Sequence, residues 1–119
     1  MDERRQFSRL NLTSDAKLIS GENQWQTQLL DISLNGALIK QPQELTLACQ
    51  SLTLEFMIHD SDICVQMQVR IVHQKNQQLG LACLHIDVES ISHLRRLLEL
   101  NLGDASLLDR ELERLFGLN

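Results

Sequence analysis

Arginine side chains gather at the start of the chain. Arg4, Arg5 and Arg9 are three of its eleven basic residues, and all three fall within the first nine positions. Guanidinium is a planar fork that donates two parallel hydrogen bonds, so it suits phosphate oxygens and the O6/N7 edge of guanine. Three such groups on one polar segment could close over a ligand that carries several phosphates and bases. Taken alone, a solvated and charged N-terminus is the simpler interpretation.

A second group of polar residues lies in the string DISLNG, at the junction of two predicted strands. Alternation along a strand places Asp31, Ser33 and Asn35 on one side. A carboxylate can accept the N1–H and N2–H donors of a guanine, and a hydroxyl beside it can donate or accept. Gly36 permits a positive φ and lets a ligand approach the backbone closely. Taken alone, Asn-Gly indicates an ordinary β-hairpin turn.

Hydrophobic periodicity predicts the elements that must position these residues. Between Lys17 and Asp87 the period is two, which is typical of half-buried antiparallel strands. We place strands near residues 15–20, 24–32, 36–40, 51–59, 63–74 and 79–87. Six short strands joined by tight turns indicate a small barrel or a sandwich.

After residue 87 the period changes to 3.6, which predicts a helix. Its N-cap is expected at Asp87 or Ser90, and Gly103 is expected to stop it. The apolar stripe of this helix should comprise Ile91, Leu94, Leu97, Leu98, Asn101 and Leu102. A second helix is expected from Asp104. The chain is thus interpreted as one domain with an arginine-rich arm (residues 1–13), a β-barrel with the first helix (residues 14–103) and the second helix (residues 104–119).

Composition and charge narrow the class of partner. The net charge of −5 argues against a DNA or RNA polymer, whose binding rests on an extended basic surface. An acidic protein with one cationic end suits a small anion better. No apolar run approaches the roughly 20 residues of a membrane span, and no secretory signal is visible, so we expect a cytoplasmic monomer that does not insert into membranes.

The residue types that carry most enzyme chemistry show no suitable spacing. The three cysteines lack a CxxC pair and are expected to be reduced thiols, and the four histidines show no HxxxH or HExxH spacing, so no metal site is expected. Nothing supplies a nucleophile with a base and an oxyanion hole. The sequence therefore favours a binding protein over an enzyme.

The two polar strings form a more specific sequence signature together than either does alone. RxxxR, formed by Arg5 and Arg9, is followed about twenty residues later by DxSxxG, formed by Asp31, Ser33 and Gly36. This order, spacing and strand context resemble the two-part signature of the PilZ domain family. The resemblance covers essentially the whole chain, and residues 80–87 look like the closing strand of the PilZ barrel. It implies a mainly β fold, a six-stranded antiparallel PilZ-type β-barrel with C-terminal helices and a flexible N-terminal arm.

The same resemblance implies a ligand, cyclic di-GMP, and no other cofactor. Arg5 and Arg9 would hold phosphates and guanine Hoogsteen edges. Asp31 and Ser33 would contact the polar edge of a guanine, and Asn35 and Gly36 would form the floor of the binding site. An arginine at position 4, directly before RxxxR, is associated in this family with an intercalated dimer of the ligand.

One further residue is a candidate at the rim of the site. His73 stands near the end of the fifth predicted strand, where the family can supply a group that stacks on a base. Its imidazole would stack more weakly than a tryptophan. An ordinary histidine at a strand end explains the residue equally well.

The resemblance also implies signalling, by a conformational change passed to a downstream protein partner that the sequence does not identify. The acidic second helix suggests that the arginine arm rests against it until ligand recruits the arm. An alternative is a PilZ-fold interaction module that binds no nucleotide. A binder of single-stranded nucleic acid is disfavoured, because the chain has three Phe, one Trp and no Tyr with which to stack bases.

Overall fold

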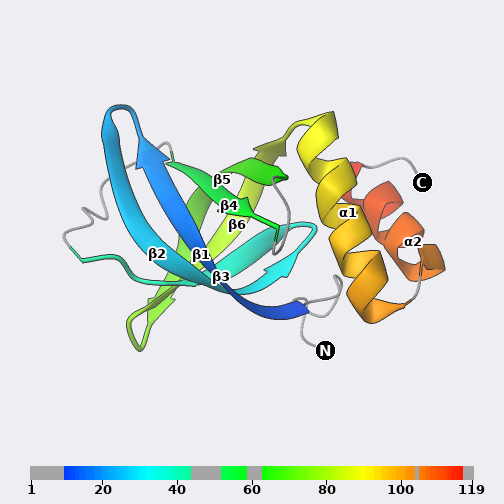
Figure 1. Ribbon diagram of the computed structural model, residues 1–119, viewed down its shortest axis with the longest axis horizontal. Helices are drawn as coiled ribbons and strands as arrows, with labels where there is room; N and C mark the ends of the chain where they lie inside the picture. Colours follow the sequence, from blue (N-terminus) through cyan, green and yellow to red (C-terminus); the bar gives the residue numbers. More distant parts are fainter. Residues whose placement is uncertain (1–9, 44–51, 59–62, 104, 117–119) are drawn as a thin grey trace.

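Six strands and two helices make up the computed structural model, which describes residues 10–43, 52–58, 63–103 and 105–116 (Figure 1). The elements are β1 (Leu10–Ser20), β2 (Asn23–Ser33), β3 (Gly36–Lys40), β4 (Leu52–Met57), β5 (Cys64–Lys75), β6 (Gln78–Ile86), α1 (Val88–Leu102) and α2 (Ala105–Phe116). All six predicted strands are present, and the change from strand to helix falls at Asp87, where the hydrophobic period changes.

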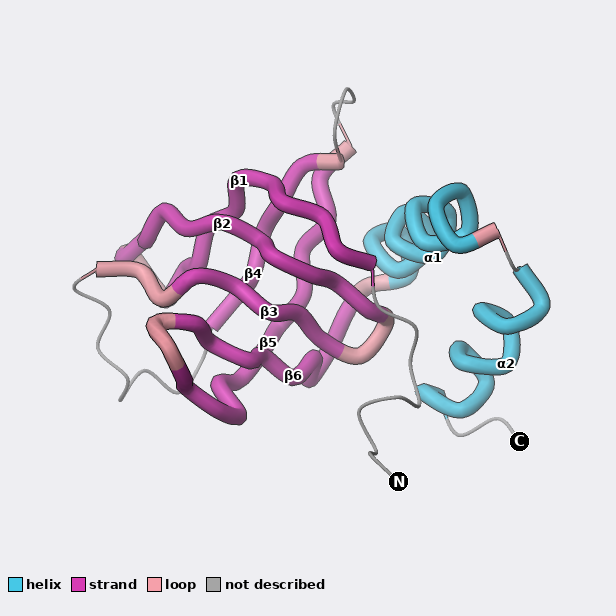
Figure 2. Tube along the Cα trace, turned by 90° about the horizontal axis from the view of Figure 1, so that it is seen from below, coloured by secondary structure: helices cyan, strands magenta, loops and turns pink. Residues whose placement is uncertain are grey.

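The strands form a closed antiparallel barrel in the order β1-β2-β3-β6-β5-β4 (Figure 2). Closure pairs every strand on both sides, so no edge is left open. The predicted six-stranded barrel is therefore confirmed. The order places β3 beside β6, so the junction of β2 and β3 lies next to strands that come more than forty residues later in the chain.

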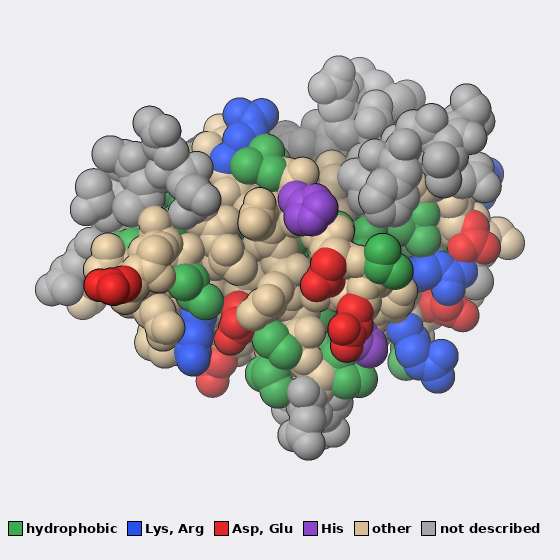
Figure 3. All heavy atoms as spheres, turned by 90° about the horizontal axis from the view of Figure 1, so that it is seen from above, with side chains coloured by type: hydrophobic (Ala, Val, Ile, Leu, Met, Phe, Trp, Pro, Cys, Tyr) green, Lys and Arg blue, Asp and Glu red, His purple; other side chains and the backbone are tan. Residues whose placement is uncertain are grey.

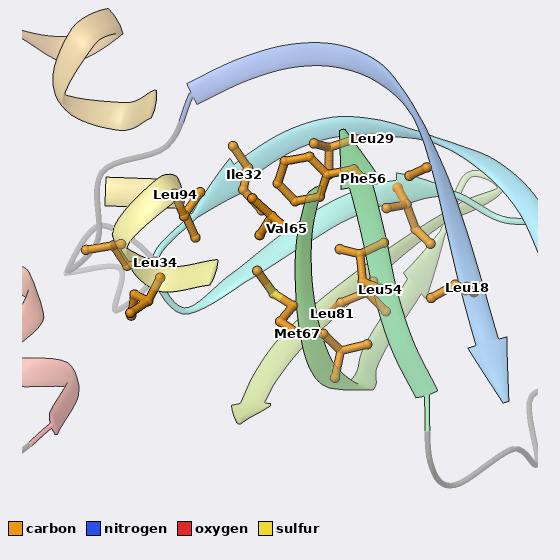
Figure 4. Close-up of a cluster of buried hydrophobic side chains, with 14 of the residues drawn as sticks. Leu18, Leu29, Ile32, Leu34, Leu54, Phe56, Val65, Met67, Leu81 and Leu94 are labelled. Atoms are coloured by element: carbon orange, nitrogen blue, oxygen red, sulfur yellow. The ribbon is translucent and has the colours of Figure 1, made fainter. Parts of the chain in front are cut away.

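The barrel interior is filled by the apolar residues of the alternating strands. Leu54 and Phe56 of β4 are buried, as are Val65 and Met67 of β5, while their neighbours along each strand are half-buried or exposed. Figure 4 shows these side chains meeting those of β1 and β2 inside the barrel. A period of two along each strand therefore separates a packed interior from an outer face that is available for binding.

Helix α1 lies across one end of the barrel and packs against β5. Leu94 and Leu98 are fully buried, as expected from the predicted stripe. Ser90 is also buried, and its hydroxyl accepts a hydrogen bond from the backbone N–H of Gln66 in β5 (3.1 Å). The helix ends at Gly103, which adopts a left-handed conformation (φ 75°) and donates its N–H to the Glu99 carbonyl (2.8 Å).

Of the two N-cap candidates, Asp87 and Ser90, the structure has Asp87 as the N-cap of α1, and the Asp87 carboxylate accepts the backbone N–H of Ser90 at 2.7 Å. This hydrogen bond lowers the pKa of Asp87 below its usual 3.8. Because the folded-state pKa is lowered, the stabilisation is complete above the unfolded value and is lost as pH falls through the folded one. We expect Asp87→Ala to lower the midpoint of thermal unfolding at pH 7 but not at a pH well below 3.8. Melting curves of both proteins across this range would refute the cap's role if the difference did not depend on pH.

Strand β1 begins earlier than expected, at Leu10 rather than near residue 15. The pairing of β1 with β2 shifts register between Asn11 and Ser14. This irregularity interrupts the alternation from which a strand is recognised, so the period-two pattern is visible only after it. Residues 10–13, which the sequence interpretation assigned to the arm, thus belong to the barrel, while residues 1–9 lie outside the described residues.

The contacts of two polar side chains in α1, Asn101 and Arg95, could not be predicted from the sequence. Asn101, predicted on the buried stripe, is exposed and donates its side-chain amide to the Leu97 carbonyl (2.8 Å). Arg95 forms ion pairs with Glu99 of α1 and with Asp109 of α2, so it links the two helices.

Two of the acidic side chains of α2 are less accessible to a partner than the sequence suggests. Asp109 is paired with Arg95, and Glu111 is buried, with 3% of its surface exposed. These two carboxylates are therefore already engaged within the described structure. No helix in the described part of the chain is long and apolar enough to cross a membrane.

Candidate functional site

A pocket of about 170 Å³ opens on the outer face of the barrel, where β2, β3, β6 and β5 lie side by side. Its lining residues are Asp31, Ser33, Asn35, Gly36, Ala37, Leu38, Val72, His73, Gly80, Leu81 and Ala82. Five of these were singled out from the sequence: Asp31, Ser33, Asn35, Gly36 and His73. The structure therefore brings the DxSxxG string and His73 together, although about forty residues separate them in the chain.

Strand register explains why these residues meet. In one cross-strand row, Asp31 of β2 pairs with Leu38 of β3, Leu38 pairs with Gly80 of β6, and Gly80 pairs with His73 of β5. Directly paired residues of neighbouring antiparallel strands project on the same face of the sheet. This row, here called the Asp31 row, thus runs across the pocket from a carboxylate on β2 to an imidazole on β5.

The β2 side of the pocket carries its preorganised hydrogen-bonding groups. Asp31 and Ser33 are buried, with 9% and 4% of their surfaces exposed. The Ser33 hydroxyl donates toward the Asn35 side-chain oxygen (2.8 Å) and lies 3.3 Å from the Gly36 carbonyl. The Asn35 carbonyl accepts the backbone N–H of Cys83 (2.8 Å). These bonds tie the turn after β2 to β6, which fixes the positions of its polar groups.

Gly36 has a different role from the one expected. It does not adopt a positive φ. A Cβ at this position would stand 2.1 Å from the Leu81 carbonyl oxygen and 3.2 Å from the Leu81 carbonyl carbon, which are backbone atoms of β6. Only glycine therefore lets β3 and β6 approach this closely.

His73 lies over a second glycine. A Cβ on Gly80 would stand 2.2 Å from the His73 Cε1 and 2.3 Å from its Nδ1, so the imidazole occupies the space that a side chain would fill. The pairing of β5 with β6 shifts register between Ile71 and His73, which places His73 opposite Gly80. The result is a planar ring resting on bare backbone at the pocket's edge, a suitable platform for stacking.

Gly80→Ala should displace this ring without unfolding the barrel. The clashing atoms belong to a movable, exposed side chain, so we expect the free energy of unfolding to change by less than about 1 kcal/mol. The ring signals of His73 in an NMR spectrum should shift clearly. Gly80→Ala combined with His73→Ala is the control that removes the clash. Unchanged His73 signals in Gly80→Ala would contradict the described packing.

The described residues do not assemble an activated nucleophile or a metal site. Cys64 and Cys83 are free, and burial is the main cause that raises the pKa of each thiol. A raised pKa leaves the thiol protonated and weakly reactive. No group of three or more His, Cys, Asp or Glu side chains within the described ranges is placed to hold a metal ion.

Arg4, Arg5 and Arg9 lie outside the described residues, but the point at which their segment joins the barrel is clear. Leu10, the first described residue, pairs with Ile32, and Asn11 pairs with Asp31. The arginine-rich segment thus meets the barrel beside the β2 residues of the pocket. In the described structure the pocket is smaller than the roughly 300–1,000 Å³ typical of small-molecule sites.

Other hollows are present on the described surface, but none of the DxSxxG residues lines them. One of about 270 Å³ is lined by Thr53, Gln66, Met67, Gln68, His85, Ile86 and Asp87. A larger hollow of about 480 Å³ is lined by Gln26, Thr27, Gln28, Lys40, Gln41, Pro42 and Gln43, and it contains no carboxylate or aromatic ring. Figure 3 shows one face on which acidic and basic side chains are interspersed, without a continuous basic strip among the described atoms. That face does not suit a nucleic-acid polymer.

Comparison with known proteins agrees with the fold and identifies a family. A family model described as the PilZ domain matches residues 3–100, a range that includes Arg4 through Ala82 of the candidate site. The PilZ domain is a domain of binding proteins and effectors, and it is not generally catalytic.

Solved structures share the fold at low sequence identity. The PilZ domain of CeSA from a cellulose-synthesizing bacterium is 15% identical, with a TM-score of 0.60, and the match covers 82% of this chain and 99% of that one. The uncharacterized Legionella protein Lpg0364 is 14% identical, with a TM-score of 0.58 and coverage of 81% and 95%. The Bacillus subtilis inhibitor of motility MotI/DgrA is 17% identical, with a TM-score of 0.61; the match covers 99% of this chain and about half (54%) of that one.

Proposed function

Because this chain belongs to the PilZ domain family, whose members generally bind cyclic di-GMP, we propose that it is a cyclic di-GMP receptor that catalyses no reaction. The observation that carries this proposal is one pocket in which Asp31, Ser33, Asn35 and Gly36 converge with His73. These are the residues of DxSxxG and the rim residue for which the sequence suggested stacking.

The chemistry of the pocket suits a guanine base. The Asp31 carboxylate can accept the N1–H and N2–H of guanine, and the Ser33 hydroxyl, which donates to Asn35, still has lone pairs that can accept. Gly36 has no side chain, so a flat base can lie close to the β3 backbone there, while the His73 ring covers Gly80. The His73 ring can then stack on a base at the rim.

The arginine segment supplies the positive charge that the pocket lacks. A cyclic dinucleotide carries two phosphates, and no Lys or Arg of the described ranges lines the pocket. Arg5 and Arg9 hold phosphates and Hoogsteen edges in this proposal, and Arg4 favours an intercalated ligand dimer. Leu10 and Asn11, which directly follow this segment in the chain, pair with Ile32 and Asp31 of β2, so the segment is attached beside the pocket.

Signalling follows from this arrangement. Ligand that bridges the arginine segment and the barrel changes the position of one relative to the other, and the new surface is available to a protein partner in the cytoplasm. Such a switch requires that the ligand bind the closed arrangement more tightly than the open one. The alternative, an interaction module that binds no nucleotide, would present its partner surface regardless of ligand.

Amide NMR spectra of the intact chain during titration with cyclic di-GMP would locate the binding site. We expect the largest changes at Gly36, His73, Gly80 and Ala82, together with signals of the first nine residues. Gln26 and Gln41, which line the larger hollow, serve as internal controls and should change little. Changes centred on the larger hollow, or no changes at all, would contradict the proposal and favour the interaction module.

A further inference from the structure

Arg70 of β5 occupies a position that the sequence strings did not indicate. Ser33 of β2 pairs with Gly36 of β3, Gly36 pairs with Ala82 of β6, and Ala82 pairs with Arg70 of β5. This Ser33 row runs parallel to the Asp31 row and crosses the same four strands. Every member of the two rows lines the pocket except Arg70, which stands at the open end of the second row.

The Arg70 side chain projects on the pocket face and is available to a ligand. It shares this face with Ala82, because directly paired residues point the same way, with Cβ atoms about 5 Å apart. An arginine side chain is longer than this separation, and Ala82 and Gly36 leave little between it and the pocket. The Arg70 side chain is exposed and makes no hydrogen bond or ion pair within the part of the chain that the structure describes.

From this register we infer that Arg70 is a further ligand-binding residue, which donates two hydrogen bonds to the O6/N7 edge of a guanine in the pocket. The inference rests on the proposed function. Asp31 and Ser33 approach from β2, and Arg70 approaches from β5, three strand spacings or about 14 Å away along the sheet. A guanine whose N1–H and N2–H meet Asp31 leaves O6 and N7, on its adjacent Hoogsteen edge, open to a second group. The carboxylate and the longer guanidinium, reaching inward, leave between them a space on the scale of one purine.

Neighbouring charge provides a control within the same strand. Lys75 lies on the face of β5 that carries His73, and it pairs with Gln78, which in turn pairs with Lys40. None of these three lines the pocket. Lys75→Ala therefore removes one positive charge from the same sheet face, but it does not remove a side chain of the Asp31 row or the Ser33 row.

Calorimetric titration of the intact chain with cyclic di-GMP tests the inference with three variants. Arg70→Ala should weaken binding by about tenfold or more, the usual range for one bidentate contact to guanine. Arg70→Lys should weaken it nearly as much, because an ammonium cannot donate two parallel hydrogen bonds to one base edge. Lys75→Ala should stay within about twofold of the unsubstituted chain, since an exposed and screened charge contributes little. Circular dichroism melts would establish that each variant is folded.

Three results would overturn the inference: wild-type affinity in Arg70→Ala, equal losses in Arg70→Ala and Lys75→Ala, or full affinity in Arg70→Lys. Equal losses in Arg70→Ala and Lys75→Ala would indicate only a general electrostatic attraction between the ligand and the positively charged sheet face. Full affinity in Arg70→Lys would indicate that residue 70 contacts a phosphate and not a base edge. If the unsubstituted chain itself fails to bind cyclic di-GMP, the proposed function falls and this inference falls with it. If the chain binds cyclic di-GMP but substitution of Arg70 does not change the affinity, this inference is wrong and the proposed function stands.

Discussion

Asp31→Ala should weaken cyclic di-GMP binding by about 2–5 kcal/mol, a loss of about 30-fold to about 5,000-fold, while the barrel stays folded. Asp31 is buried on the β2 side of the pocket, where little water competes for its oxygens. Removing the carboxylate leaves the N1–H and N2–H of the bound guanine without an acceptor. Such an unmade bond to a charged group costs more than the same bond at an exposed position. Calorimetric titration measures this loss directly.

Two comparisons make the Asp31 result specific. Asp31→Asn keeps the size of the side chain but removes its charge and one acceptor, so it should also bind weakly. Asp15→Ala removes the same charge from an exposed position of β1 and should bind as the unsubstituted chain does. Wild-type affinity in Asp31→Ala would show that the pocket does not hold a guanine by this edge.

Gly36→Ala should destabilise the barrel by about 3 kcal/mol, the upper end of the usual cost of overpacking. The new Cβ would stand 2.1 Å from the Leu81 carbonyl oxygen, and only backbone lies close by: the Leu81 carbonyl carbon at 3.2 Å and the Ala82 Cα at 3.4 Å. No side chain can move aside, so β3 and β6 must separate and weaken the hydrogen bonds that close the barrel. Chemical denaturation followed by circular dichroism would measure the change.

Gly80→Ala is the matched comparison, because it adds the same methyl group to a neighbouring cross-strand row. There the clash is with the movable His73 ring and not with backbone. The two substitutions should therefore separate, with a large loss of stability in Gly36→Ala and a small one in Gly80→Ala. Similar stabilities for the two variants would mean that β3 and β6 are not held together as tightly as described.

The sequence was most informative where one local rule decides the structure. Alternation predicted all six strands, and Asp87 and Gly103 marked the two ends of α1 because a cap needs only neighbouring backbone. The DxSxxG string was recognisable for the same reason, since its residues lie within six positions. Its outer side did prove to line one pocket.

Features that depend on register between distant strands were beyond local rules. The bulge between Asn11 and Ser14 hid the start of β1, and the bulge before His73 decides that this residue faces Gly80. Gly36 was expected to serve the turn, but its missing side chain accommodates a strand that comes more than forty residues later. Arg70 had no local motif at all, and only the pairing across four strands connects it with Ser33.

Calorimetric titration of the intact, unsubstituted chain with cyclic di-GMP is the most direct test of the central claim. A receptor of this design should give saturable binding, with two nucleotides per chain if Arg4 favours the intercalated dimer. A ratio of one would retain the receptor and remove the dimer. No heat of binding, together with NMR spectra that do not change when the nucleotide is added, would contradict the claim that this pocket binds cyclic di-GMP.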